Sequence, residues 1–180
     1  MSAITDKMVE RKRLTAARLR KLLTYNPATG VFTRRISCAS NARAGSIAGW
    51  ISGAGRRTIR VDKRHYYAAR LAWLYVHGRW PTHEIDHINR VRDDDRLCNL
   101  REATHSQNNA NCTVKSHNAS GFKGIYFKRA TGKWGASIRY GKKSYYLGYY
   151  TSPQLAHAAY AKAAKNFFGA FACSENSHAS

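Results

Sequence analysis

The spacing of apolar residues near the start of the chain predicts a helix. In VERKRLTAARLRKLL (9–23), the apolar side chains share one face and the charged side chains occupy the other. The apolar face holds Ala16, Leu19, Leu22 and Leu23, and the charged face holds Arg11, Arg18 and Lys21. YNPATG (25–30) follows, and its Pro and Gly end the helix.

Strand-like runs and a second helix complete the first part of the chain. The runs lie at 31–35 (VFTRR), 46–51 (SIAGWI) and 57–61 (RTIRV). YYAARLAWLYVHG (66–78) predicts a helix with Tyr67, Leu71 and Leu74 on one stripe, and Gly78 and Pro81 close it.

Residues 81–111 combine strand-like and turn-like patterns. The expected order is a strand EIDHI (84–88), a polar loop NRVRDDDRLC (89–98) and a strand NLREA (99–103). Thr104 and Gln107 form the capping-box pattern T-x-x-Q, so a helix is expected to begin at His105. Asn108 then lies in the first turns of that helix.

The last part of the chain predicts three strands and one helix. The strand-like runs are FKGIYFK, WGASIRY and SYYLGYY, and Ser152-Pro153 is a good start for the helix that follows. Strand alternation places Ile125, Ala136, Ile138 and Leu147 toward the helix. The opposite face then carries Tyr126, Lys128, Ser137, Arg139, Ser144 and Tyr146, which suits a DNA major groove. We expect Tyr145, Tyr149 and Tyr150 to pack rather than contact DNA.

The charge of the chain narrows the class of partner. Its 180 residues suffice for one compact domain or two small ones, and 31 Lys and Arg against 10 Asp and Glu give a net charge of +21. Such an excess favours nucleic acid over an anionic membrane. No apolar run approaches the ~20 residues needed to span a bilayer, and the N-terminal residues lack the apolar core of a signal peptide.

Six of the ten acidic residues fall between 84 and 102, which suggests that one of them holds a cation. The four cysteines contain no C-x-x-C pair, so we expect reduced thiols, with neither structural zinc nor disulfides.

The pattern D-H-I-N-x(9)-N-L-R-x-x-T-x-x-x-N, over about 30 residues, resembles the HNH nucleases of the phage homing-endonuclease type, with the ββα-metal fold. The resemblance implies that His87 is the general base and that Asp86 and Asn108 hold one Mg²⁺ ion, with Mn²⁺ as a substitute. It also implies that Asn99 orients the loop and His87. Asn108 stands in place of a third histidine, as in the H-N-N branch, and Arg90-Val91-Arg92 stands where relatives often have Gly-Asn.

Several polar residues have simpler interpretations. The run Asp93-Asp94-Asp95 is expected to be a solvated loop, and His83 and His105 are expected to lie at the surface. Generic phosphate contacts are assigned to Arg11, Arg13, Arg18, Arg56, Arg57 and Arg60, although arginines of a basic protein are often only solvated.

The last segment resembles the plant ethylene-response-factor (AP-two) DNA-binding domain over about 50 residues, through GFKGI, GKWGASIR, YYLGYY and AAYAKAA. The resemblance implies DNA contacts by Lys123, Tyr126, Lys128, Arg139, Ser144 and Tyr146. Tyr126 and Ser144 replace family arginines and Tyr146 replaces a tryptophan, so base preference does not carry over.

The sequence thus predicts an α+β protein in four parts. A small basic N-terminal α/β segment (1–80) packs on a ββα-metal nuclease core (81–111), and a linker (112–120) leads to a three-stranded antiparallel sheet on one helix (121–173). The expected function is site-recognising, metal-dependent cleavage of double-stranded DNA. We expect a cytoplasmic monomer that nicks, because a single metal site meets one phosphate at a time. The alternatives are a DNA-binding regulator with an inactive nuclease remnant and an RNA-binding accessory protein.

Overall fold

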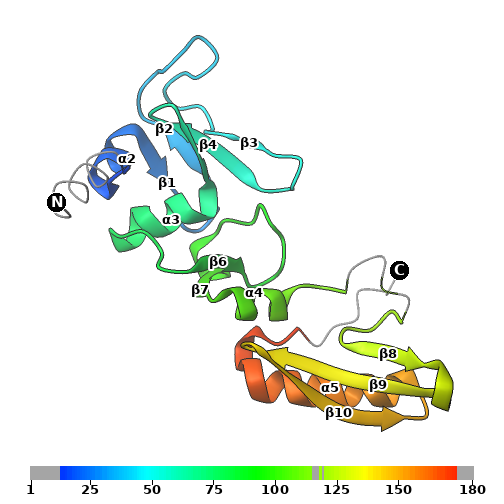
Figure 1. Cartoon of the computed structure of the whole chain (residues 1–180). Helices are drawn as coiled ribbons and strands as arrows, with labels where there is room; N and C mark the ends of the chain where they lie inside the picture. The colour runs from blue at the N-terminus through cyan, green and yellow to red at the C-terminus, as the bar shows by residue number, and fades with distance from the viewer. Residues whose placement is uncertain (1–12, 115–117, 119, 174–180) are drawn as a thin grey trace, which may run out of the picture. The chain divides into compact units, whose positions relative to one another are not determined.

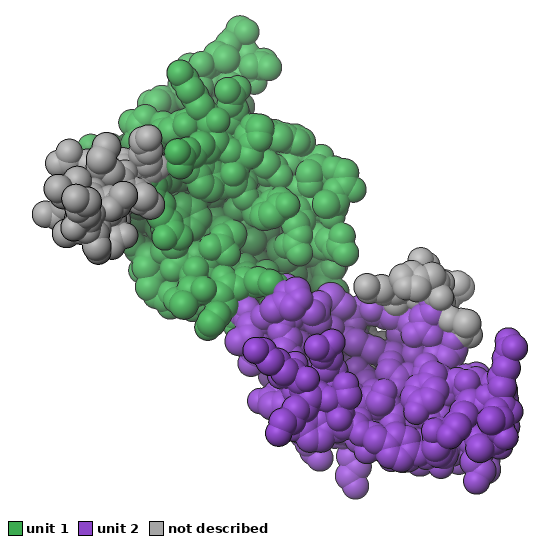
Figure 2. All heavy atoms as spheres, in the orientation of Figure 1, with its two compact units in different colours: residues 1–102 green, residues 103–180 purple. Residues whose placement is uncertain are grey.

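The computed structural model (Figure 1) describes residues 13–114, 118 and 120–173. These fall into two compact units, residues 1–102 and 103–180, which Figure 2 colours green and purple. Residues 9–12 of the first predicted helix, with Arg11, lie outside the described residues, as does part of the predicted linker 112–120.

The first unit begins with helix α2 (Ala16–Leu22), capped by the Thr15 hydroxyl, which accepts from the Arg18 amide. The predicted helix extended to residue 23, but Leu23 already belongs to strand β1 (Leu23–Tyr25). The reason is tertiary: β1 pairs antiparallel with β2 (Phe32–Arg34), so its backbone groups are satisfied across the turn between them.

Strands β3 (Trp50–Ile51), β4 (Arg57–Val61) and β5 (Arg64–Tyr67) form an antiparallel sheet in that order. Helix α3 (Ala68–His77) follows directly and ends at Gly78, whose φ of 73° is left-handed. The predicted helix started two residues earlier, but Tyr66 and Tyr67 pair with β4.

Strands β6 (Glu84–His87) and β7 (Leu100–Ala103) are hydrogen-bonded as a two-stranded sheet, and all but the last residue of β7 belong to the first unit. The 3₁₀ turn η1 (Leu97–Asn99) precedes β7. Ile85 and Leu100 belong to the same buried cluster as Leu19, Phe32, Ile59 and Leu71. The N-terminal segment and the strands that carry the predicted catalytic residues therefore share one core.

The second unit starts with helix α4 (His105–Asn111), which has the predicted capping box: the Thr104 hydroxyl accepts from the Gln107 amide and Gln107 accepts from the Thr104 amide. Strands β8 (Ile125–Lys128), β9 (Lys133–Tyr140) and β10 (Lys143–Tyr150) form an antiparallel sheet in the order β10-β9-β8. Short 3₁₀ turns lie at η2 (Arg129–Thr131) and η3 (Gly169–Phe171).

Helix α5 (Pro153–Phe168) packs on this sheet, with Ser152 as its N-cap and Pro153 in its first turn, as expected. Its small residues Ala156 and Ala164 are buried, and Tyr160 and Phe168 join them. The sheet contributes Ile125, Ala136 and Ile138 to the same cluster, and Leu147, the fourth predicted helix-facing residue, is half-buried against it.

The mixture of helices and antiparallel sheets confirms the α+β class. The finer assignments, a ββα-metal core and an AP-two-like sheet, stay predictions, and so does the four-part domain division. Among the described residues, none of the helices combines the length and apolar character that crossing a bilayer requires.

Candidate functional site

A buried histidine–aspartate pair lies at the end of β6. His87 Nε2 is 2.9 Å from Asp95 Oδ1, and the two residues are 5% and 2% exposed. The other carboxylate oxygen, Asp95 Oδ2, is buried and has no hydrogen-bond partner among the residues that the structure describes. Burying a carboxylate costs free energy unless a cation or a hydrogen-bond donor faces it. The His87 ring meets that need at Asp95, and the hydrogen bond fixes the orientation of the imidazole.

The burial of Asp95 overturns one prediction. We expected the run Asp93-Asp94-Asp95 to be a solvated loop, and of the three only Asp93 is exposed. Asp94 is half-buried, and its carboxylate accepts hydrogen bonds from the Arg96 guanidinium, which lower the pKa of Asp94 to about 2. The run therefore shapes the site, because its last member faces His87.

The N-terminal segment supplies the support beneath Asp95. The Tyr25 hydroxyl donates to the Asp95 carbonyl at 2.7 Å, and the Leu97 amide donates to the Pro27 carbonyl at 3.0 Å. Gly30, with φ of +75°, approaches so closely that a Cβ there would lie 2.5 Å from the Asp95 carbonyl carbon. The turn YNPATG, which appeared to be only a helix breaker, thus holds the loop opposite His87.

Asn99 joins the two strands and the loop between them. Its Oδ1 accepts from the Asn89 amide at 2.9 Å, and its Nδ2 donates to the Asp94 carbonyl at 2.8 Å. The Asn99 carbonyl also accepts from the Ile88 amide, directly after His87. These bonds suit the orienting role that we predict for Asn99.

Arg90 occupies a position that favours glycine. Its φ is +67°, in the left-handed region, and its amide donates to the His87 carbonyl to close a tight turn. A residue with a Cβ is disfavoured there, which explains physically why glycine suits the equivalent turn of the resembled family.

Asp86 is the second buried acid of β6, at 4% exposure. Its Oδ2 accepts from Arg101 Nε of β7 at 2.8 Å, so the guanidinium sets the orientation of the carboxylate. Carboxylate and amide oxygens are the hard ligands that Mg²⁺ prefers, and a buried, oriented carboxylate beside His87 fits such an ion.

Asn108, the other predicted ligand, lies on α4 in the second unit, and its distance from Asp86 stays a prediction. No group of three or more His, Cys, Asp or Glu that could hold a metal occurs among the described residues. A ligand pair of one carboxylate and one amide is not such a group.

The face of the C-terminal sheet opposite α5 carries the predicted DNA contacts. Tyr126, Lys128, Arg139, Ser144 and Tyr146 are exposed, and Ser137 is half-buried. Ser144 pairs with Arg139 and Tyr146 pairs with Ser137, and since directly opposed residues share a face, these four side chains lie together.

Tyr149 also belongs to this face, where its ring packs against those of Tyr126 and Tyr146. A bulge between Tyr146 and Gly148 shifts the register, so Tyr149 pairs with Gly135, the residue that also pairs with Tyr126. Its ring lies 5.2 Å from that of Tyr146, and Lys128 Nζ lies 4.8 Å from its centre. The hydrogen bond from Lys128 lowers the pKa of the Tyr149 hydroxyl.

The other two tyrosines of β10 behave as expected. Tyr145 stacks near Phe167 of α5, at 4.8 Å between ring centres, and Tyr150 packs on the buried cluster of the second unit. Glycine at 148, with φ of +121°, was the sequence signal for the bulge.

Lys123 has a structural role that the sequence did not indicate. Its ammonium donates to the carbonyls of Asn109, Ala110 and Cys112 at 2.6, 2.9 and 3.0 Å. Burial lowers the pKa of Lys123. Because all three ammonium donors face the end of α4, we leave Lys123 out of the interface that we propose below.

The arginines that we assigned to phosphate contacts have varied surroundings. Arg18 forms an ion pair with Asp62 at 2.9 Å, which lowers the pKa of Asp62. Arg13 lies over the Trp80 ring and Arg56 over the Tyr67 ring, while Arg60 is exposed and Arg57 half-buried. Their contacts with DNA stay a prediction.

The described geometry is thus a buried imidazole paired with a carboxylate, with a second buried acid at the preceding position of β6. A family model described as HNH endonuclease matches residues 66–110, which takes in α3, β6, β7 and most of α4. The match supports an HNH nuclease, and HNH nucleases act on DNA and generally use a divalent metal ion. No curated protein and no solved structure matches the chain.

Proposed function

We propose that this protein is a site-recognising HNH endonuclease that hydrolyses double-stranded DNA with one divalent metal ion. The observation that carries the proposal is the buried His87–Asp95 pair at the end of β6, next to Asp86. Buried polar side chains at adjacent positions of one short strand have no evident use in packing, whereas they suit proton transfer at a phosphodiester.

His87 acts as the general base. When Nε2 carries its proton toward Asp95, the lone pair of the neutral ring is on Nδ1, and this atom takes the proton of the attacking water. The ring then becomes an imidazolium, and the Asp95 carboxylate at 2.9 Å stabilises the new positive charge. Asp95 is therefore a positioning residue for His87.

Asp86 and Asn108 would hold the metal ion, which we propose to be Mg²⁺. When bound, the ion neutralises the charge that develops on the phosphoryl oxygens and on the leaving 3′ oxygen. Arg101 keeps the Asp86 carboxylate in one orientation through its 2.8 Å hydrogen bond. A single carboxylate leaves most of the cationic charge available to the substrate.

The C-terminal sheet recognises the DNA site. Its open face offers a cation beside a hydroxyl, Arg139 next to Ser144, and a tyrosine cluster beside Lys128. Arginine pairs with guanine edges and phosphates, and exposed rings contact thymine methyl groups. The acid-free composition of residues 103–174 removes repulsion from the phosphates.

Three finer features belong to the proposal. The chain works as a monomer, it nicks one strand at a time, and it serves as a homing endonuclease of the phage type. The nicking follows from a monomer with one metal site, which meets one phosphate at a time, and the homing role rests on the resemblance of residues 86–108.

The test is cleavage of supercoiled plasmid carrying candidate sites. Wild-type protein with Mg²⁺ should produce open circles, and EDTA should abolish them. His87→Ala removes the base and should lower the rate by about 10²–10⁴-fold. The matched control is His83→Ala, which removes an exposed histidine of the same segment and should leave the rate unchanged.

Each outcome separates the alternatives. Tight duplex binding with no open circles in either Mg²⁺ or Mn²⁺ would show a DNA-binding regulator with an inactive remnant. Equal rates for His87→Ala and wild type would show that His87 is not the base. Preference for RNA in a competition with duplex DNA would favour the RNA-binding alternative.

A further inference from the structure

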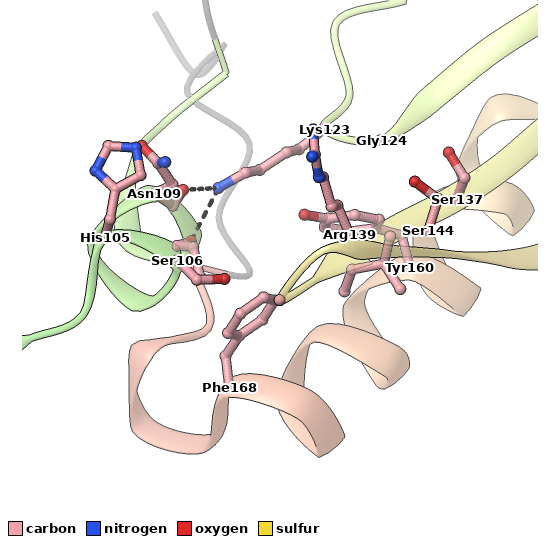
Figure 3. A pocket seen from close by; sticks show the side chains of 13 residues that line it. His105, Ser106, Asn109, Lys123, Gly124, Ser137, Arg139, Ser144, Tyr160 and Phe168 are labelled. Atoms are coloured by element: carbon pink, nitrogen blue, oxygen red, sulfur yellow. Dashed lines mark hydrogen bonds between the residues drawn. The ribbon is translucent and has the colours of Figure 1, made fainter.

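A cavity of about 670 Å³ lies within the second unit, between α4 and the β9–β10 end of the sheet. Its polar lining includes His105, Ser106 and Asn109 of α4, Ser137, Arg139 and Ser144 of the strands, Tyr160 of α5, and Lys123. Figure 3 shows the α4 side chains on one side of the cavity and Arg139 with the two serines on the other. The volume is in the range of roughly 300–1,000 Å³ that is typical of ligand sites.

The chemistry of the lining selects for an anion that also carries an apolar part. Arg139 supplies a permanent positive charge, and Ser106 and Ser144 supply hydroxyl donors. The sequence has no Asp or Glu from residue 103 to 174, so no carboxylate opposes an anion here. Ile138 and Phe168 add carbon surface to the same cavity. A nucleotide, with a phosphodiester and a sugar, has both characters.

The two walls of the cavity are fixed to each other. The three hydrogen bonds of Lys123 join the end of α4 to the start of the sheet, and Figure 3 shows its ammonium turned toward α4. The Cys173 amide donates to the Ala110 carbonyl, and Ala110 belongs to the same buried cluster as the sheet. A cavity held in this way is formed before any ligand arrives, which lowers the entropic cost of binding.

We infer that this cavity binds one nucleotide unit of the DNA strand, with its phosphate at Arg139, Ser106 and Ser144 and its sugar against Phe168. The inference rests on the proposed function and extends it. Helix α4, which carries Asn108, and the strands that carry Arg139 and Ser144 then bind the same DNA strand. Ser106 thereby becomes a DNA-binding residue that neither family resemblance indicated.

A pair of matched substitutions tests the inference. Ser106 and Gln154 are both the second residue of a helix, after the N-caps Thr104 and Ser152. Ser106→Asp places a carboxylate in the cavity, and Gln154→Asp places one on the exposed surface of α5, away from the lining. An acid in the first turn favours either helix, so neither change should unfold the protein.

The measurement is the affinity of the full chain for duplex DNA, in EDTA, over a range of salt concentrations. Ser106→Asp should weaken binding about tenfold and reduce the slope of log K against log salt by about 0.9, the value of one lost phosphate contact. Gln154→Asp should change the affinity less than about twofold and keep the slope, because a distant charge is screened.

Equal affinities and slopes for the two variants would overturn the inference. Because binding is measured without metal, nicking in Mg²⁺ is a separate result. Wild-type protein that binds but never nicks would overturn the proposed nuclease, and a difference between the two variants would still support the cavity. Wild-type protein that does not bind duplex DNA would overturn both.

Discussion

Replacing Asp95 with asparagine should lower the rate of nicking while leaving the free energy of unfolding nearly unchanged. The substitution keeps the shape of the side chain and removes its charge. Because Asp95 is 2% exposed and lies 2.9 Å from His87 Nε2, the lost charge acts at short range and away from solvent. A hydrogen bond to a charged group contributes about 1.5–3 kcal/mol. At about 1.36 kcal/mol per factor of ten, the rate of nicking should fall about tenfold to 150-fold.

Stability should respond differently. In the wild-type protein Asp95 Oδ2 is buried without a partner among the described residues, so the folded state already bears an unsatisfied charged oxygen. In Asp95→Asn the unsatisfied group is a neutral amide, and burying it costs a free energy similar to, or smaller than, that of the carboxylate oxygen. The free energy of unfolding should therefore change by about 1 kcal/mol or less, although the rate falls.

The assay is plasmid nicking under single-turnover conditions, with urea unfolding of the same preparations. The control is Asp93→Asn, the same chemical change two positions away on an exposed side chain. Asp93→Asn should match wild type in both measurements. A wild-type nicking rate for Asp95→Asn would refute the role of the pair, and so would an equal loss of rate in both variants.

Three further substitutions test contacts of the two units. Gly30→Ala should lower the free energy of unfolding of the first unit by more than about 2 kcal/mol and slow nicking, because the new Cβ would lie 2.5 Å from the Asp95 backbone. The control is Gly45→Ala, whose φ is similar but whose Cβ would meet open space, and it should cost only about 1 kcal/mol. Thermal unfolding measures both. The Arg96 guanidinium lowers the pKa of Asp94 to about 2, so the ionised carboxylate stabilises the fold fully above the unfolded pKa of about 3.9, and this stabilisation is lost as the pH falls toward 2. In urea unfolding, the free energy of unfolding of Asp94→Asn should fall by about 1 kcal/mol less than that of wild type over this pH range. The same pH profile for both proteins would contradict the ion pair. Tyr149→Ala removes an exposed ring and should lower the ratio of specific to nonspecific duplex affinity about tenfold, whereas Tyr149→Phe, which keeps the ring, should keep most of that ratio. A wild-type ratio in Tyr149→Ala would show that Tyr149 does not take part in recognition.

Local rules accounted for much of the second unit. The capping box at Thr104, the Ser152-Pro153 start of α5 and the buried positions of the sheet were all predictable, because each depends on residues close in sequence. The bulge at Gly148 was the exception. One inserted residue reverses strand parity, so Tyr149 lies on the same face as Tyr146, whereas simple alternation places them on opposite faces.

The candidate site was predictable in part. Fixed spacing singled out Asp86, His87 and Asn99, and the structure places the first two on β6 with Asn99 bonded across the loop. Asp95 was missed because an aspartate in a polar run resembles any solvated loop residue. Its burial is decided by Tyr25, Pro27 and Gly30, which lie some seventy residues away in sequence.

By itself, the sequence determined that helices and strands lie in these segments, which residues are apolar enough to be buried, and which short motif bears the chemistry. These depend on backbone hydrogen bonds and side-chain periodicity over a few residues. The tertiary structure decided which carboxylate faces His87, that Lys123 ties α4 to the sheet, and that a cavity lies between them. Such pairings are set by the packing of distant segments, because a buried charge is tolerated only where the fold brings a partner to it.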